Sequence, residues 1–302
     1  MTPIAVILIL ISALVHAGWN LLGKQENPSA AFFLVANTLG GLCLSSVLVF
    51  YGRILPLFPK PVWALLVLTG LFQAVYYAAL AGAYRRGDLS ITYPLARSSP
   101  VIVVTIVTLI LGRGDQVSTQ CIWGILAVVA GCFLLPMRRF KDFRIDNYLN
   151  FAALLALVAA FGTAGYSILD DEALRRLRHL PDLPAVGWQI AALYAFCEAI
   201  TGSLWLGAFV LLRREGRTAL RNVLRKRVWY AARAGVAIYL TYTLVLVSMA
   251  FVSNVSYVVA FRQTSVPLGA MLGVFVLKEP RHVPKFVGVA ILFLGLVLVG
   301  TG

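Results

Sequence analysis

The sequence predicts an all-α membrane protein with ten transmembrane helices, arranged as two inverted-topology five-helix repeats. Three observations support this prediction. Of the 302 residues, 60% are hydrophobic and only 13% are charged. Apolar runs of about 20 residues, the length that crosses a bilayer, recur along the whole chain. The two halves also match one another weakly. A soluble domain of this size could not bury so much apolar surface in one core.

Ten apolar segments are predicted to span the membrane, because each is long enough and carries few charges. They comprise residues 3–23, 29–51, 61–84, 89–111, 119–137, 148–169, 186–212, 228–251, 254–277 and 284–301. The first lacks a preceding basic stretch, so we expect an uncleaved span and not a signal peptide. Residues 138–147 are the predicted linker between a first repeat, 1–137, and a second, 148–302. Residues 170–184 are a candidate short surface helix.

Basic residues give the formal net charge of +14 and predict the orientation. Most of them lie in the odd-numbered loops between the spans, above all in residues 213–227. The positive-inside rule then places these loops in the cytoplasm and both termini outside. Since the basic residues lie in short loops, the expected partners are the lipid bilayer and a small-molecule solute, with no nucleic acid. The oligomeric state stays open.

The sequence contains no pattern typical of a cofactor, metal or catalytic site. The cysteines lie inside apolar runs without metal-ligand spacing, so neither zinc nor disulfides are implied. They are Cys43, Cys121, Cys132 and Cys197. There is no phosphate-binding glycine loop before a lysine and no HExxH sequence. We therefore expect no catalytic residues, no cofactor and no enzyme. Compact loops and the lack of eukaryotic targeting signals favour a bacterial inner membrane.

Three pairs of short sequences match in the same order in the two halves. "HAGWNLLGK" resembles "TAGYSILDD", "YPLARSSPV" resembles "VVAFRQTSV", and "WGILAVVAGCFLL" resembles "VGVAILFLGLVLV". They pair His16 with Thr163, Trp19 with Tyr166, Asn20 with Ser167, Arg97 with Arg262, Gly124 with Gly288, and Gly131 with Gly295. Because five spans are an odd number, the second repeat must enter the membrane inverted. Secondary transporters use this arrangement for alternating access.

Two further stretches are distinctive: "AYRRGDLSITYPLARSSPVIVV" and "LGAMLGVFVLKEPRHVPKFVGVAILFLGLVLV". On these stretches the chain resembles the EamA-type branch of the drug/metabolite transporter superfamily, and the resemblance extends over essentially the whole chain. It implies a ten-helix fold and transport of small metabolites, often export of amino acids or related compounds. It also implies that both termini are cytoplasmic, which conflicts with the charge count. The orientation of the termini therefore has two competing predictions.

Two arginines stand inside predicted spans, where a charge is costly and is a functional candidate by default. Arg97 and Arg262 occupy matching positions in the two repeats. Inversion would direct the two guanidiniums toward opposite faces of the membrane. Each could attract an anionic group such as a carboxylate, or lock a gate. The alternative is that the long side chains snorkel to the interface or pair helices.

Prolines in the same two spans predict structural kinks. Pro94, Pro100 and Pro267 each remove a helical hydrogen bond and leave a carbonyl free. Freed backbone groups are tolerated at membrane depth only where they face protein or a watery cavity. Ser98 and Gln263 could satisfy them or contact a substrate. A purely structural kink is the alternative.

Glu198 is interpreted as the only acidic residue clearly deep in a span. A carboxyl at that depth is a candidate proton-coupling site. The alternative is a structural ion pair with Arg233, Arg97 or Arg262. His16, with Trp19 and Asn20, ends the first span. The histidine is a candidate proton relay or a satisfied hydrogen-bond partner, and Trp19 a candidate member of the interfacial aromatic belt.

Tyrosines at membrane depth suit a cavity for a partly apolar solute, although each could equally be packing. They are Tyr76, Tyr77, Tyr166, Tyr239, Tyr242 and Tyr257. The cavity is expected between the halves. The function predicted is secondary active transport, with export expected, of a small amphipathic metabolite such as an amino acid or other carboxylate. The alternatives are a proton-coupled cation or drug exporter that uses Glu198, and an intramembrane enzyme.

Overall fold

The computed structural model describes residues 1–23, 29–86, 89–135, 137–142, 149–181, 183–275 and 282–302. Within these ranges the regular secondary structure is entirely helical, without a strand, so the all-α class is confirmed. The α-helices are α1 (Pro3–Gly23), α2 (Ala30–Cys43), α3 (Ser46–Tyr51), α4 (Lys60–Arg86), α5 (Leu89–Ile110), α6 (Thr119–Leu134), α7 (Phe151–Arg178), α8 (Gly187–Leu211), α9 (Arg214–Lys226), α10 (Val228–Ser248), α11 (Val255–Phe261), α12 (Ser265–Phe275) and α13 (Val283–Thr301).

Short 3₁₀ turns continue several of these helices. They are η1 (Gly52–Leu57), η2 (Gly114–Gln116), η3 (Phe140–Asp142), η5 (Met249–Phe251) and η6 (Arg262–Thr264). Two predicted spans are not single straight helices. The predicted span 29–51 contains α2 and α3, and the chain bends by 41° between Ala30–Cys43 and Ser46–Leu57. The predicted span 254–277 is divided into α11 and α12 by η6.

Helices occupy all ten segments predicted to be spans, but their lengths differ. Among the described residues, five helices are long and apolar enough to cross a membrane: α4, α7, α8, α10 with η5, and α13. The bent pair around α2 and α3 raises the number to six if it is one span. Shorter apolar helices lie at Pro3–Ala17, Leu95–Ile110 and Thr119–Leu134. The chain is therefore an all-helical, multi-pass membrane protein.

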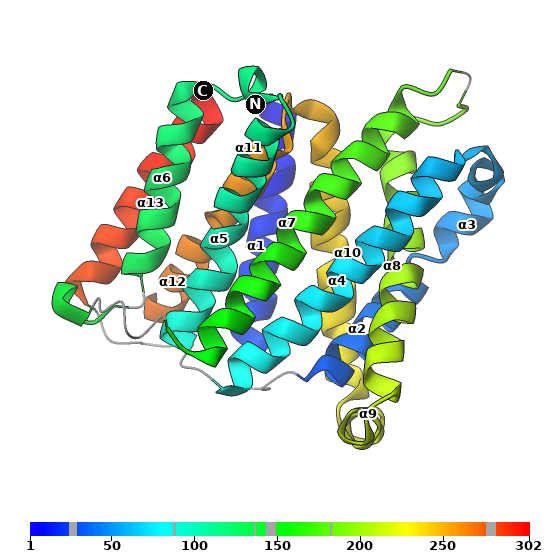
Figure 1. Cartoon of the computed structure of the whole chain (residues 1–302), viewed down its shortest axis with the longest axis horizontal. Coiled ribbons are helices and arrows are strands. Elements are labelled where there is room, and N and C mark those ends of the chain that lie inside the picture. Colours follow the sequence, from blue (N-terminus) through cyan, green and yellow to red (C-terminus); the bar gives the residue numbers. More distant parts are fainter. Residues whose placement is uncertain (24–28, 87–88, 136, 143–148, 182, 276–281) are drawn as a thin grey trace.

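The helices run roughly side by side in one bundle, and both termini lie at the same end (Figure 1). The amphipathic helix α9 lies at the opposite end. Helix α4 packs along α7 and α8, while α10 packs along α1 and α2. Helices α6 and α13 form a separate close pair at one edge of the bundle. The middle of the bundle thus contains helices from both halves of the chain.

Glycines bring α6 and α13 into backbone contact. A Cβ on Gly124 would lie 2.7 Å from the carbonyl oxygen of Gly295, and a Cβ on Gly131 would lie 2.7 Å from that of Gly288. Substitutions on α13 meet the same obstacle. Cβ atoms on Gly288 and Gly295 would lie 2.9 and 2.7 Å from the carbonyl oxygens of Gly131 and Gly124. Small residues permit this approach where lipid cannot drive helices together.

Helix α7 corrects the prediction that a span ends at residue 169 and a surface helix follows. It is continuous from Phe151, capped by the Asn150 side chain, to Arg178. Residues 170–178 include neither glycine nor proline, so nothing interrupts the helical backbone there. Leu174 and Leu177 are fully buried, so packing extends two turns beyond the expected end. Asp170 consequently lies inside the bundle and not in a loop.

Replacing Gly131 with alanine should destabilise the protein by about 1–3 kcal/mol, because the new methyl group meets backbone atoms that cannot move aside. Thermal unfolding of the purified protein in detergent measures the change. Gly269→Ala is the matched control, since no atom lies within 4 Å of its Cβ position. Equal unfolding temperatures for the two variants would contradict the close contact of α6 with α13.

Candidate functional site

A fully buried carboxylate, Asp170 of α7, stands at the centre of the bundle. Its Oδ1 accepts hydrogen bonds from the hydroxyls of Thr69 on α4 and Tyr194 on α8, both at 2.9 Å. Its Oδ2 accepts a hydrogen bond from the hydroxyl of Tyr242 on α10. Three neighbouring helices therefore converge on one side chain of α7. A buried polar group is stable only where such partners replace water.

Glu198 of α8 is a second fully buried carboxyl in the same region. Its Oε1 accepts a hydrogen bond of 2.8 Å from Nε2 of Gln73 on α4, while Oε2 has no hydrogen-bond partner. Among the described residues no ion pair within 4.0 Å involves Glu198. Glu198 and Asp170 interact electrostatically with one another and with Arg262. The structure therefore does not form the direct ion pair considered as its alternative role.

An amide network lies beside Glu198 and joins α2, α8 and α10. Nδ2 of Asn37 donates to the carbonyl of Ala199 at 3.0 Å and to the hydroxyl of Ser203 at 2.9 Å. The hydroxyl of Tyr239 donates to Oδ1 of Asn37 at 2.7 Å. Both hydrogen-bonding atoms of the Asn37 side chain are therefore satisfied, which suits a structural role for this group.

Four tyrosines form a continuous aromatic row that ends at Arg262. The rings of Tyr77 and Tyr76 are 4.9 Å apart, those of Tyr76 and Tyr166 are 5.9 Å apart, and those of Tyr166 and Tyr242 are 5.5 Å apart. The guanidinium of Arg262 lies 5.2 Å from the ring centre of Tyr242, a cation–π distance. Helices α4, α7 and α10 contribute these rings.

The two predicted arginines, Arg97 and Arg262, approach one another from different halves of the chain. Nη2 of Arg97 on α5 donates to the hydroxyl of Ser265 at 2.7 Å, only three residues after Arg262. Both arginines also interact electrostatically with His16 of α1. The expected separation toward opposite faces stays a prediction, and in this structure the Arg97 side chain reaches the start of α12.

The break between α11 and α12 places Arg262 on a 3₁₀ turn. Pro267 is the third residue of α12, where its missing N–H costs no intrahelical bond. Side chains satisfy carbonyls around the break. Nε2 of Gln263 donates to Val259, Oγ1 of Thr264 to Phe261, and Oγ of Ser265 to Arg262. Local polar residues thus stabilise a turn that directs the guanidinium toward the tyrosine row.

Several buried polar atoms of this region have no hydrogen-bond partner. They include two guanidinium nitrogen donors, Nε of Arg97 and Nη1 of Arg262. Acceptors without partners include Oε2 of Glu198 and Oε1 of Gln263. Unsatisfied buried polar atoms are costly and are often found where a ligand binds. The region can therefore donate to an anionic group and accept from a cationic one.

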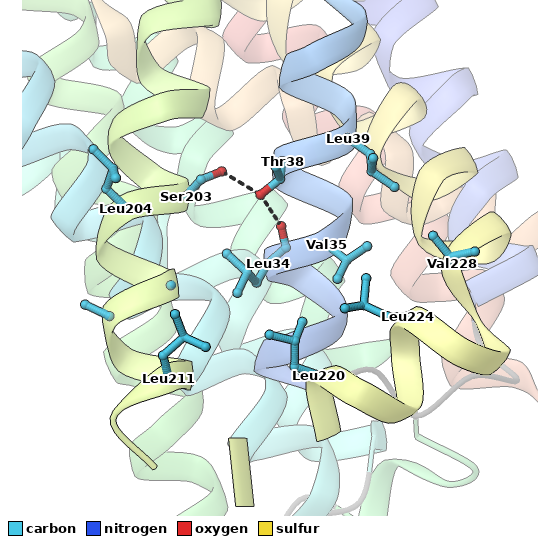
Figure 2. Close-up of a pocket in the computed structure, with 12 residues that line it drawn as sticks. Leu34, Val35, Thr38, Leu39, Ser203, Leu204, Leu211, Leu220, Leu224 and Val228 are labelled. Carbon is cyan, nitrogen blue, oxygen red and sulfur yellow. Dashed lines mark hydrogen bonds between the residues drawn. The ribbon is translucent and has the colours of Figure 1, made fainter. Parts of the chain in front are cut away.

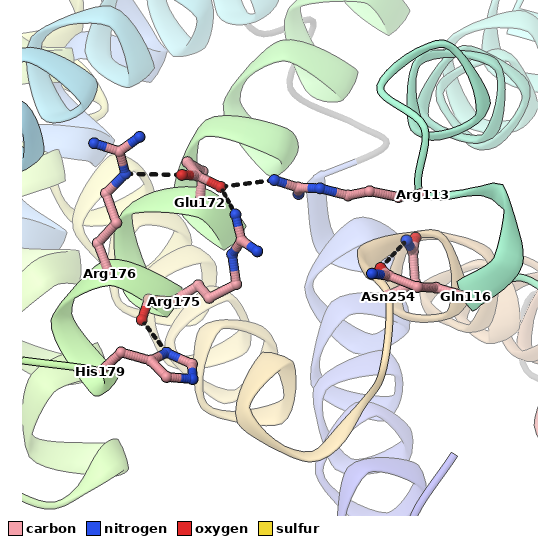
Figure 3. A network of polar contacts seen from close by, with 7 residues as sticks. All are labelled: Arg113, Gln116, Glu172, Arg175, Arg176, His179 and Asn254. Carbon is pink, nitrogen blue, oxygen red and sulfur yellow. Dashed lines mark hydrogen bonds and ion pairs between the residues drawn. The ribbon is translucent and has the colours of Figure 1, made fainter.

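A separate ionic network ties the two halves together at the end of the bundle that holds the termini (Figure 3). Glu172 of α7 accepts hydrogen bonds from Arg113 at 3.0 Å, from Arg176 at 2.7 Å and from Arg175. Nearby, Nδ2 of Asn254 donates to Oε1 of Gln116 at 3.2 Å. These contacts lie outside the tyrosine row.

The structure brings together most of the predicted site residues but separates some. Those in or beside the cluster are Arg97, Arg262, His16, Glu198, Gln263, Tyr76, Tyr77, Tyr166, Tyr239 and Tyr242. Tyr257 lies elsewhere, where its hydroxyl accepts from the backbone N–H of Ser118. Ser98 is fully buried in α5, which runs unbroken through Pro100. The side chains of Trp19, Asn20 and Pro94 lie outside the described residues.

Asp170 is the main residue that the sequence reasoning missed. The statement that Glu198 alone is acidic and deep in a span is wrong, because Asp170 is equally buried. A signal was present in the helical spacing. Thr163, Ser167 and Asp170 follow one another at intervals of four and three, which puts them on one face of a helix. Thr69, Gln73 and Tyr194 were missed with it.

The described residues include no group of three or more His, Cys, Asp or Glu side chains that could hold a metal ion. Cys121, Cys132 and Cys197 are buried in helices, and Cys43 is exposed. The apolar pocket shown in Figure 2 lies between α2, α8, α9 and α10. None of the predicted site residues lines it, so the pocket is distinct from the cluster around Asp170.

Comparisons with known proteins agree with the predicted resemblance. Residues 3–137 match the EamA-like transporter family, so the resemblance is confirmed over the first half of the chain. A solved crystal structure shares the fold at a TM-score of 0.65, with 16% identity, over 98% of this chain and 97% of that one. No curated protein matches the chain significantly.

The first half of the chain is similar to a family of membrane transporters, and the solved structure shows the fold alone. Apolar helices long enough to cross a bilayer make the chain an integral membrane protein. The portion that matches the EamA-like transporter family contains α1 to α6, and this match suggests a membrane transporter. A small-molecule solute and the lipid bilayer are the partners that this class implies.

Asp170→Ala should lower the free energy of unfolding by about 1–3 kcal/mol, because three buried hydroxyls lose their acceptor. Thermal unfolding in detergent measures the loss. Asp170→Asn should lose less, since its amide keeps one acceptor oxygen. Asp115→Ala, at an exposed aspartate, is the matched control. If Asp170→Ala were as stable as the control, the carboxylate would not organise the surrounding helices.

Proposed function

We propose that the protein is a secondary active transporter that works by alternating access. In this proposal ten spans form two inverted repeats, residues 1–137 and 148–302, joined by the linker 138–147. The helix contacts support an inverted pair. The proposed repeats pair α1 with α7, α2 with α8, and α4 with α10. Exchanging each helix for its counterpart therefore converts the contact of α4 with α7 into that of α10 with α1. It likewise converts the contact of α2 with α10 into that of α8 with α4, and all four contacts occur.

The glycines of α6 and α13 support the same symmetry. The repeat pairs Gly124 with Gly288 and Gly131 with Gly295. The contact of Gly124 with Gly295 then becomes the contact of Gly288 with Gly131, and the structure has both. An internal two-fold axis of this kind lets one protein alternate between outward and inward access with equivalent packing.

The proposed substrate is a small zwitterion, with an amino acid as the first candidate. The observation that carries this proposal is the presence of unpaired donors and acceptors in one buried region. Nη1 of Arg262 and Nε of Arg97 could bind a carboxylate, and Oε2 of Glu198 could bind an ammonium group. Arg262 and Glu198 interact electrostatically, so one small molecule could engage both. The row of tyrosines offers an apolar surface for its side chain.

Glu198 and Asp170 have different proposed roles because their partners differ. Asp170 has three hydroxyl donors and is proposed to hold the helices together. Glu198 has one donor and a free oxygen, so it can exchange a proton or bind a cation. Export across a bacterial inner membrane is the proposed direction and location. The second candidate, a proton-coupled cation or drug exporter, is favoured by the free oxygen of Glu198.

Arg262→Gln should reduce transport about tenfold or more, because a charged hydrogen bond to the solute is lost. The measurement is uptake and counterflow of a panel of radiolabelled amino acids by the protein in liposomes. Arg97→Gln should also reduce the transport rate. Arg138→Gln, in the exposed linker region, is the matched control. Wild-type rates for both site variants in correctly inserted protein would exclude an anion site at these arginines.

Glu198→Gln distinguishes the two candidate functions. For a zwitterion transporter coupled through Glu198, counterflow without a pH gradient should persist at reduced affinity, while accumulation driven by a pH gradient should disappear. For a cation exporter, both activities should disappear, and Arg262→Gln should leave them intact. Parallel flux measurements in the same liposomes, with and without an imposed pH gradient, separate these outcomes.

A further inference from the structure

Helix α9 is amphipathic and strongly basic, and the transport site does not use it. Its apolar residues Leu220, Val223 and Leu224 recur at intervals of three and one, so they lie on one face of the helix. A strip of arginines borders this face on one side, because the spacing of three and four residues aligns them. The strip consists of Arg214, Arg217, Arg221 and Arg225.

The apolar face of α9 closes one side of a pocket of about 430 Å³ (Figure 2). The size falls in the range of small-molecule sites. Leucine and valine side chains provide most of the lining, and the only polar side chains are the hydroxyls of Thr38 and Ser203. The lining residues are Leu34, Val35, Thr38, Leu39, Ser203, Leu204, Gly207, Ala208, Leu211, Leu220, Leu224 and Val228.

The pocket opens toward the lipid. Leu204, Leu211 and Leu224 line it and are 67%, 51% and 52% exposed. In a bundle that crosses a membrane, exposed leucines on the outer faces of α8 and α9 contact acyl chains. The two hydroxyls are already hydrogen-bonded, since Oγ1 of Thr38 donates to the Leu34 carbonyl and contacts Ser203. The pocket therefore suits an apolar chain and not a polar metabolite.

Charge indicates which lipid would bind there. Arg214, Arg221 and Arg225 are exposed on α9, and the helical spacing places them beside its apolar face. Arg217 is partly engaged, because its Nη1 donates to the carbonyl of Leu211 at 2.6 Å. Glu215, the only acidic residue of α9, points away from this strip by helical periodicity. Juxtamembrane basic residues attract anionic headgroups.

We propose that α9 and this pocket form a binding site for an anionic glycerophospholipid of the surrounding bilayer, with one acyl chain between α2, α8 and α9. The phosphate and headgroup bind the strip of Arg214, Arg221 and Arg225. An acyl chain in this position contacts α2, α8 and α10, which also carry Asn37, Glu198 and Tyr239. Lipid occupancy thereby stabilises the arrangement of helices next to the cluster. The proposal does not depend on which solute is transported.

The test compares retention of phosphatidylglycerol and phosphatidylcholine, both with the same acyl chains, by native mass spectrometry of the purified full-length protein. The wild type should retain phosphatidylglycerol at least about tenfold better. The double variant Arg221→Gln with Arg225→Gln should lose this preference. The double variant Arg138→Gln with Arg139→Gln, which removes the same charge from another exposed segment, should keep it. Equal retention of both lipids by the wild type would overturn the proposal.

A second variant tests the acyl-chain pocket independently of charge. Gly207→Leu should fill it, and the fold should tolerate the change, since a Cβ there would lie 3.8 Å from its nearest neighbour, Leu34. Retention of both lipids should fall at least severalfold, while the unfolding temperature measured in detergent without lipid stays within a few degrees. Unchanged retention in a folded Gly207→Leu protein would show that lipid does not enter the pocket and would overturn the proposal.

Discussion

The convergence of three hydroxyl groups on the Asp170 carboxylate is the interaction on which the rest of the bundle depends. Water cannot solvate this carboxylate, which is fully buried, so Thr69, Tyr194 and Tyr242 must replace its hydration. These residues come from α4, α8 and α10, which fixes the positions of three helices around α7. Removing any of these helices would leave a buried carboxyl oxygen or hydroxyl without a partner in an apolar medium.

The same constraint positions the groups that bear on function. The Tyr242 ring, held by its hydroxyl on Asp170, packs against Tyr166 on one side and lies beneath the Arg262 guanidinium on another. Gln73, one helical turn from Thr69 on α4, reaches Glu198. Satisfied and unsatisfied polar atoms thus lie side by side. The satisfied atoms stabilise the fold, and the unsatisfied ones, on Arg97, Arg262, Glu198 and Gln263, are the groups proposed to bind the solute.

Polar side chains also explain how the bundle accommodates its interrupted helix. Proline and the hydroxyl and amide side chains around η6 produce a local turn without leaving its carbonyls unsatisfied. That turn allows Arg97 in the first half of the chain to contact Ser265 in the second half. At the termini end, Glu172 and Arg113 form another contact between the halves. The contacts of Arg97 with Ser265 and of Arg113 with Glu172 therefore connect the proposed repeats, in addition to the glycine contacts of α6 and α13.

Apolar periodicity and length located nearly every helix from the sequence, because a segment in lipid must satisfy its backbone internally and therefore becomes a helix. The sequence also indicated the candidate site residues, since polar groups at membrane depth are costly enough to stand out. These are Arg97, Arg262, Glu198 and the tyrosines. Only the tertiary structure decided which of them meet. Asp170 escaped notice because its place inside the bundle depends on α7 continuing past the apolar run. That continuation is stabilised by packing of Leu174 and Leu177, which no local pattern reveals.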